Sequence, residues 1–360
     1  NKKTLIKREN ADRGKDIHLT LNINYQSILI EEMNKGLLKH NAKSASGIIM
    51  DPKTGSILAM GSVPSYDPNE YGSFSDKLYI NRAVTDLYEP GSIFKIIPIA
   101  AAIEEEFITM HDSIFCDNGK YTFPSGRILR DHDEHGKISV QDIFAHSSNI
   151  GIAKIIDLIG DKTLYKYCRD FGIGAKVLID LPNVEKGKLR PYRDWNSESG
   201  AIVAIGQEVS ATLLQMSVAY CSIANGGIML SPKIIKTGFY PEVRRQVISK
   251  NTAEKIRNAM EVAVLKGSAQ NSKMSNYSIG GKTGTAQKII NGKYSEKEFI
   301  SSYASIFPVE NPQFVCIISV DSPDYGFHWG NFSAAPIVKE IYNRIIMSEQ
   351  IKNNDIALFK

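Results

Sequence analysis

The 360-residue sequence has little excess charge and no long hydrophobic run. Its 43 basic and 39 acidic residues leave a net charge of +4, a balance that does not indicate a nucleic-acid partner. No uninterrupted apolar run approaches the roughly 18 residues of a membrane span. The nearest one, residues 92–103, is short and contains Lys95. A hydrophobic share of 42% and a charged share of 23% predict a globular chain of one large or two modest domains.

Cysteine is also scarce, and no two cysteines form a C-x-x-C pair. The four are Cys116, Cys168, Cys221 and Cys316. Zinc clusters and disulfide frameworks usually show tighter spacing, so buried free thiols are the favoured interpretation. The G-x-S-x-G nucleophile elbow is absent as well, which leaves no basis for an α/β-hydrolase.

The stretch IGGKTGTAQK, residues 279–288, contains parts of two different motifs. Gly-Lys-Thr could end a phosphate-binding P-loop, G-x-x-x-x-G-K-[ST], which requires a glycine at position 276. The sequence has Asn276 there, and polar, turn-like residues follow where a helix should begin. Nucleotide binding is therefore disfavoured, and Lys-Thr-Gly is the motif to explain.

Hydrophobic periodicity predicts strands at both ends of the chain and helices between them. Helices are expected at 24–41, within 139–160 and 210–227, and at 335–347; strands are expected as a hairpin in 45–62 and at 277–287, 301–309 and 313–322. Residues 348–360 are expected to form a loose tail. This order predicts an α/β fold of the α+β type, with one antiparallel sheet assembled from distant segments and a helical insertion.

Ser92 and Lys95 form an S-x-x-K motif directly after Pro90-Gly91. The punctuation predicts a helix that begins at Ser92, so Lys95 lies on the same face and can reach the serine hydroxyl. The backbone N–H of Ser92 would then be free for an oxyanion, and a desolvated lysine could activate the serine. S-x-x-K alone also arises by chance about once in a chain this long, and Pro98 should disturb the helix.

Two further segments carry hydroxyl, amide or amine side chains of the types that take part in catalysis or substrate binding. In AHSSNIGIAK, Ser147 and Asn149 precede a helical run, where an ordinary N-cap is the simpler explanation. In Lys282-Thr283-Gly284-Thr285, alternate residues of an edge strand face opposite ways, and a glycine lets another backbone approach. The lysine could attract a substrate carboxylate, or it could simply be a solvated lysine beside a bulge.

Together and in this order, S-x-x-K, S-x-N and K-T-G are the set of penicillin-recognising serine enzymes. The chain therefore resembles the transpeptidase domain of class B penicillin-binding proteins, of the division (septal) or sporulation type. MDPKTGSILAMGSVPSYDPN, YEPGSIFK, HSSNIGIAK, IANGG, GGKTGTAQK and AAPIVKEI all look like that family. The resemblance covers roughly residues 15–347.

The resemblance implies a role for each matched position. Ser92 would be the acylated nucleophile, Lys95 its general base and Ser147 a proton relay. The Asn149 amide would hold the substrate backbone, and Lys282 and Thr283 would receive the terminal carboxylate. Gly284 would allow the close approach on this strand. The N–H of Thr285, with that of Ser92, would form the oxyanion hole.

The family fold is a five-stranded antiparallel sheet flanked by helices, plus an all-helical subdomain. By this resemblance residues 1–20 are a linker from a missing N-terminal region, 21–347 the transpeptidase domain, with its helical subdomain at roughly 66–275, and 348–360 a C-terminal tail. A membrane anchor and a pedestal domain in the full-length protein follow from the family alone.

Some positions depart from the family or stay open. Family members often have two glycines where this chain has Gly330-Asn331, next to Trp329 as a possible cleft wall, and proline at the position of Leu213. The DHDEH stretch, residues 131–135, offers metal-ligand types but is expected to be a solvated loop, so no metal or cofactor is predicted. Tyr66 and Trp195 are expected to be packing residues.

The implied activity is extracytoplasmic D,D-transpeptidation of peptidoglycan stem peptides ending in D-Ala-D-Ala, with β-lactams acylating the same serine. Division glycosyltransferases and other membrane proteins would be partners of the full-length chain. The rivals are a β-lactam-hydrolysing or D,D-carboxypeptidase relative and a non-enzymatic β-lactam sensor. No E-x-x-L-N segment, the usual source of a deacylating carboxylate in class A β-lactamases, occurs here; Glu185 in EKGKL is the nearest approach.

Overall fold

A five-stranded antiparallel sheet forms the centre of the computed structural model, which describes residues 14–236, 238 and 240–358, without the side chains of 351–358. Its order is β2 (Ile57–Val63), β1 (Ser44–Met50), β11 (Phe314–Asp321), β10 (Lys293–Phe307) and β9 (Gly280–Ile290). Segments far apart in the chain are thus neighbours: Ile48 of β1 pairs with Met60 of β2 and with Ile317 of β11. The predicted sheet is confirmed, with β9 at one edge.

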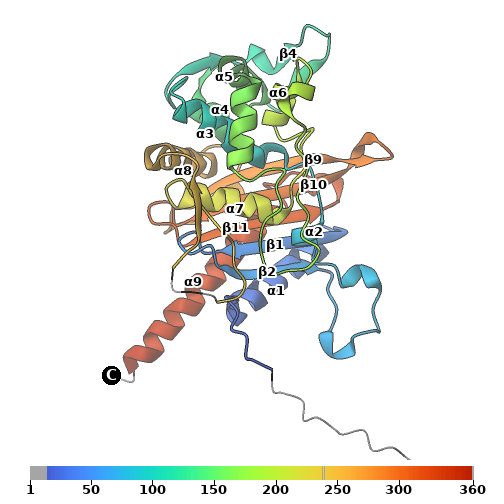
Figure 1. Ribbon diagram of the computed structural model, residues 1–360, viewed down its shortest axis with the longest axis vertical. Coiled ribbons are helices and arrows are strands. Elements are labelled where there is room, and N and C mark those ends of the chain that lie inside the picture. The colour runs from blue at the N-terminus through green and yellow to red at the C-terminus, as the bar shows by residue number, and fades with distance from the viewer. Residues whose placement is uncertain (1–13, 237, 239, 359–360) are drawn as a thin grey trace, which may run out of the picture.

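Helices cover both faces of this sheet because successive strand residues alternate between two cores. Helices α1 (Ile23–Lys39) and α9 (Ala334–Leu358) pack on one face, in a core that contains Ile49 and Ile318. Helices α7 (Leu213–Ala224) and α8 (Lys250–Leu265) pack on the other, whose core contains Ile48 and Ile317. In Figure 1 the sheet crosses the middle of the molecule, with α1 and α9 below it.

The remaining helices are α2 (Arg82–Thr85), α3 (Ile96–Glu104), α4 (Val140–His146), α5 (Asn149–Asp170) and α6 (Ser199–Ala204). Short strands pair as β3 (Ser113–Phe115) with β6 (Lys137–Ser139), β4 (Lys120–Thr122) with β5 (Ile128–Arg130), and β7 (Ile228–Leu230) with β8 (Val243–Gln246). Of these elements, α3, α4, α5, α6 and β4 are labelled above the sheet in Figure 1, whereas α2 lies beside the strands. The segment expected to be all-helical therefore also contains small antiparallel strand pairs.

Three sequence expectations need correction. The helical segment expected within 139–160 is two helices, because Ser147 between them adopts a left-handed conformation with φ of 65°. The expected loose tail is helical as far as Leu358, since α9 continues past residue 347. The turn at Ser92 is a 3-10 helix, η3 (Gly91–Lys95), and the α-helix begins only at Ile96.

Pro98 fits this last arrangement. It lies in the first turn of α3, where a backbone N–H has no partner within the α-helix, so its missing donor costs little.

Other expectations hold. All four cysteines are buried free thiols. Tyr66 packs against the ring of Tyr79, and Trp195 against that of Tyr165. The linker was expected at residues 1–20, and its first 13 residues lie outside the described residues. At its other end, the Thr20 N–H donates to the Ile234 carbonyl oxygen at 2.8 Å. Among the described helices, none has the length and apolarity needed to cross a membrane.

Candidate active site

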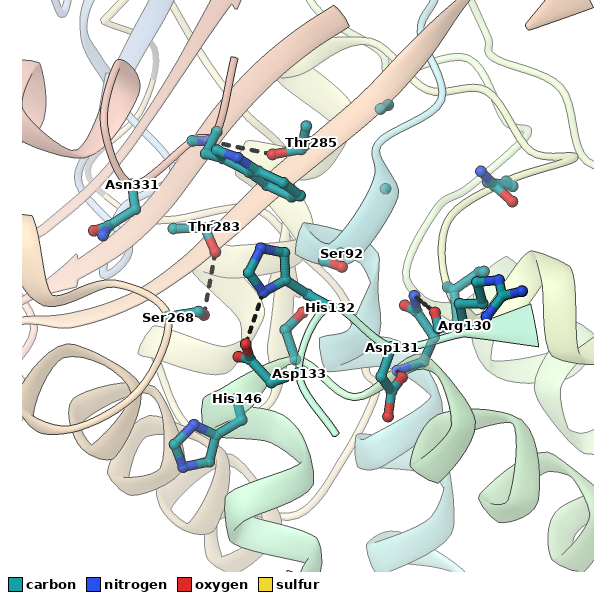
Figure 2. Close-up of a pocket in the computed structure, with 18 of the residues that line it drawn as sticks. Ser92, Arg130, Asp131, His132, Asp133, His146, Ser268, Thr283, Thr285 and Asn331 are labelled. Atoms are coloured by element: carbon teal, nitrogen blue, oxygen red, sulfur yellow. Dashed lines mark hydrogen bonds and ion pairs between the residues drawn. The ribbon is translucent and has the colours of Figure 1, made fainter. Parts of the chain in front are cut away.

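A cavity of about 490 Å³ lies between β9, the η3 turn and the loop that follows β5. Six of the predicted site residues line it: Ser92, Ser147, Asn149, Thr283, Thr285 and Trp329. Figure 2 shows Ser92 between the two threonines of β9 on one side and Arg130 and Asp131 on the other. Motifs separated by up to 190 positions in sequence therefore meet at one site.

The turn that carries Ser92 is held against β9 by close backbone contacts. Gly91 has a φ of +55°, and its N–H donates to the Gly206 carbonyl at 3.0 Å. A Cβ atom on Gly206 would lie 2.2 Å from the Gly91 oxygen, and one on Gly91 would lie 3.2 Å from the Thr285 oxygen. Only glycine fits at these two positions. The packing places the half-buried Ser92 beside the edge strand.

Lys95 is completely buried and donates to groups of the S-x-N segment. Its Nζ lies 2.6 Å from the Ser147 carbonyl oxygen, 3.2 Å from Ser147 Oγ and 2.7 Å from Asn149 Oδ1. Burial lowers the pKa of Lys95 from 10.5 to about 7, against an opposing effect of the Asp131 carboxylate. Among the described residues its hydrogen bonds include none to Ser92, although the sequence predicted that contact.

Ser147 lies between two lysines. Its Oγ accepts from Lys95 Nζ at 3.2 Å and from Lys282 Nζ at 2.8 Å. Both lone pairs of the hydroxyl oxygen are then occupied, so its own proton is left to donate elsewhere. The hydroxyl is thus placed to receive and pass on a proton.

The N-cap of α5 is Ser148, whose Oγ accepts from the Gly151 N–H at 2.9 Å. The capping interpretation of this segment is therefore correct for Ser148, while Ser147 is the left-handed C-cap of α4. The one motif thus serves both a structural and a chemical purpose.

Asp131 is the residue that the sequence interpretation missed. Its carboxylate accepts from Ser148 Oγ and from the Asn149 N–H, both at 2.5 Å, and from the Ile150 N–H at 3.0 Å. An anion at a helix N-terminus satisfies free N–H groups and interacts favourably with the helix dipole. Asp131 therefore fixes the start of α5 behind the cavity. Only its acidic type was visible in the sequence, since the helix it caps begins 18 positions later.

Strand β9 shows the predicted alternation. Thr283 and Thr285 line the cavity, whereas Lys282 and Gly284 face the packed side. A Cβ on Gly284 would lie 2.4 Å from Ser302 Oγ and 3.0 Å from the Pro90 oxygen, which explains the glycine. Thr283 Oγ1 donates to Ser268 Oγ at 3.2 Å.

Lys282 is completely buried, and its pKa is lowered well below 10.5, first by burial and then by the charge of Lys95. Burial and the neighbouring amine therefore disfavour two charged lysines at once, and an anion beside Lys282 would favour its charged form.

The outer wall of the cavity comes from the loop before α9 and from the DHDEH stretch. The Trp329 side chain is 38% exposed and contacts the His132 ring edge-on at 4.7 Å between ring centroids. Asn331 is tied to Asn271, whose N–H donates to Asn331 Oδ1 at 3.0 Å. His132 Nδ1 and Asp133 Oδ1 lie 2.9 Å apart. Within the described residues no three His, Cys, Asp or Glu side chains gather in a way that could hold a metal ion.

Comparison with known proteins agrees with this fold. Residues 45–343 match the family described as penicillin binding protein transpeptidase domain. The chain belongs to this family, in its class B branch.

Among its relatives, stage V sporulation protein D of Bacillus subtilis is 35% identical over 91% of this chain and 53% of its own length. The probable peptidoglycan D,D-transpeptidase PenA of Neisseria meningitidis is 31% identical over 91% of this chain and 56% of its own length. The chain thus spans about half the length of these curated relatives.

Solved structures give the same result. Penicillin-binding protein 3 from Mycobacterium tuberculosis, complexed with aztreonam, superposes with a TM-score of 0.86 and 29% identity over 95% of this chain and 82% of its own. The transpeptidase domain of penicillin-binding protein 3 from Burkholderia pseudomallei gives a TM-score of 0.84 and 27% identity over 92% and 96%.

Proposed function

We propose that this chain is the catalytic domain of a peptidoglycan D,D-transpeptidase that works through a serine acyl-enzyme. The observation that carries the proposal is the Ser147 hydroxyl, which accepts hydrogen bonds from both Lys95 and Lys282 in the cavity that contains Ser92. A nucleophile, a lysine with a pKa near neutrality and a relay hydroxyl are the groups that acyl transfer requires.

In the proposed acylation, neutral Lys95 takes the Ser92 proton, and Ser92 Oγ attacks the carbonyl carbon between the two terminal D-alanines of a stem peptide. The Ser92 and Thr285 N–H groups stabilise the oxyanion. The C–N bond then breaks, the leaving D-alanine amine receives a proton through Ser147, and an ester remains on Ser92. An amine of a neighbouring stem peptide attacks the ester, which restores Ser92 and completes the cross-link.

Substrate recognition in this proposal depends on the β9 edge. The terminal carboxylate binds at Thr283 and Lys282, and the Asn149 amide contacts the substrate backbone. Because Lys282 is buried next to another amine, an arriving carboxylate favours its protonated form. With the positive charge held at Lys282 by the carboxylate, the neutral form is favoured at Lys95, which serves as the base. Trp329 contributes the cleft wall.

The rival functions differ in what resolves the acyl-enzyme. A hydrolase needs a carboxylate that activates water, and Glu185, the nearest sequence candidate, is not among the described residues that line the cavity. A β-lactam sensor would acylate without turnover of peptide. The absence of a class A deacylation segment and the names of the relatives favour the transpeptidase.

The setting of the reaction is proposed on the same basis. β-Lactams would acylate Ser92 as substrate mimics. The full-length protein would be anchored in the bacterial membrane with this domain outside the cytoplasm, where glycosyltransferase and division proteins would be its partners.

The test is covalent labelling with a fluorescent penicillin, read by intact-protein mass spectrometry. One adduct per chain is expected for the wild type and for Ser73→Ala, a control at an exposed serine, and none for Ser92→Ala. An undiminished adduct on Ser92→Ala would remove the nucleophile assignment. Cross-linking of stem peptides with an added amine then separates the transpeptidase from the sensor.

A further inference from the structure

A second cavity, of about 370 Å³, lies between the turn that joins β1 to β2, the end of α7 and the first turns of α8. Its described lining shares no residue with the cavity that contains Ser92. Three cationic side chains line it, Lys53, Lys250 and Arg257, and no aspartate or glutamate is among its described lining residues. The described lining of the cavity therefore carries positive charge only.

Arg257 is the unusual member of this group, because its side chain is only 8% exposed. One guanidinium nitrogen, Nη1, donates to the Ile223 carbonyl oxygen at 3.1 Å near the end of α7, while Nε is buried without an acceptor in the described structure. Glu254 acts on it only through space. Buried charges are normally paired, because an uncompensated one is costly. Among the described residues the guanidinium therefore has no ion-pair partner in contact with it, and its Nε has no acceptor.

The two lysines lie at the exposed rim of the same cavity. Lys53 Nζ donates to Asn311 Oδ1 at 2.9 Å, which holds the amine at the β10–β11 turn. Among the described residues neither Lys53 nor Lys250 forms an ion pair. Each amine therefore keeps donors available for an incoming anion.

We propose that this cavity is a binding site for a phosphate group, with Arg257 at its base and Lys53 and Lys250 at its rim. A phosphate offers several acceptor oxygens and up to two negative charges, which compensates three cations better than a single carboxylate does. Apolar lining residues, among them Leu230 and Val243, give room for an organic group attached to the phosphate. The inference is independent of the proposed function, since it uses no residue of the Ser92 site.

Isothermal titration calorimetry of the whole chain with sodium pyrophosphate tests the site. We expect binding with a Kd below about 1 mM. The double variant Lys53→Gln/Lys250→Gln should weaken it at least tenfold. The control pair, Lys39→Gln/Lys77→Gln, makes the same charge change at exposed lysines elsewhere and should leave the Kd unchanged. Both pairs change surface residues, so neither should impair folding, and penicillin labelling of both should match the wild type.

Vesicle sedimentation distinguishes the two sources of the phosphate. If the chain binds phosphatidylglycerol vesicles but not phosphatidylcholine vesicles, and Lys53→Gln/Lys250→Gln abolishes that binding, the ligand of the cavity is a lipid headgroup. If the chain binds pyrophosphate but neither kind of vesicle, the ligand is a soluble phosphate. The proposal is overturned if the wild type binds neither probe, or if both lysine pairs weaken binding equally, since that reports general charge attraction. Normal penicillin labelling in the same samples would keep the proposed function intact.

Discussion

The buried Lys95 amine should give acylation a pH dependence centred near neutrality. With a pKa of about 7, the neutral and therefore basic form makes up about one tenth of the enzyme at pH 6, half at pH 7 and nine tenths at pH 8. The acylation rate should accordingly rise about fivefold from pH 6 to pH 7 and level off above about pH 8. A lysine at its ordinary pKa of 10.5 would instead let the rate rise about tenfold per pH unit through this whole range.

Asp131→Asn tests the cause of this midpoint. The Asp131 carboxylate raises the pKa of Lys95 against the larger effect of burial, so its removal should move the midpoint to lower pH. The side-chain oxygen of asparagine can still accept from the Asn149 and Ile150 N–H groups. Its amide nitrogen cannot accept from Ser148 Oγ, so that hydrogen bond is lost. One lost charge-assisted bond should lower the free energy of unfolding by about 1–3 kcal/mol.

The assay is stopped-flow acylation by a fluorescent penicillin between pH 5.5 and 9, a range chosen to extend about 1.5 to 2 pH units on either side of the expected midpoint. Asp133→Asn is the matched control: it neutralises a carboxylate at the same cavity that accepts from His132 and makes no described bond to α5. Its midpoint should equal that of the wild type. A midpoint for Asp131→Asn that stays in place or rises, in a variant that unfolds cooperatively, would refute the assignment of Lys95 as the base.

Three further predictions follow from the site. Gly284→Ala places a methyl group 2.4 Å from Ser302 Oγ, so the acylation rate should fall at least tenfold and the free energy of unfolding by about 1–3 kcal/mol. The control Gly326→Ala, where a Cβ meets nothing within 4 Å, should change neither quantity. Equal effects of the two variants would contradict the argument. Lys95→Ala should nearly abolish the rate constant of acylation at saturating penicillin, whereas Lys282→Ala should mainly raise the penicillin concentration needed, and a normal rate constant for Lys95→Ala would be inconsistent with a base. The penicilloyl adduct should persist for hours by mass spectrometry, even with bicarbonate added to favour carbamylation of Lys95; its loss within seconds would indicate a hydrolase.

Much of this site could be predicted because the relevant patterns are local. The alternation along β9 and the start of a helical turn after Pro90 are read from neighbouring residues, and both agree with the structure, although the turn is a 3-10 helix and Lys95 donates to Ser147 and Asn149. The N-cap at this segment was predicted, but the left-handed backbone of Ser147 could not be read in this way. Its carbonyl oxygen accepts from Lys95, 52 positions earlier, and that contact exists only in the fold.

The same limit applies to charge and to capping. The sequence shows that Lys282 is a lysine, but its lowered pKa depends on burial and on the nearby amine of Lys95, which only the fold brings together. Asp131 belongs to a stretch that suggested a solvated loop or a metal, because the helix that it caps is distant in sequence. The helix beyond residue 347 was missed because its polar composition carries no strong apolar period.

The left-handed backbone of Ser147 sets fold stability against chemistry at a single position. A residue with a Cβ costs roughly 1–2 kcal/mol in this conformation, and glycine would avoid that cost. Glycine, however, carries no hydroxyl to stand between the two lysine amines. Selection for a more stable protein alone would therefore favour the loss of this serine, and selection for acyl transfer must retain it. At this junction greater stability and activity therefore require different residues.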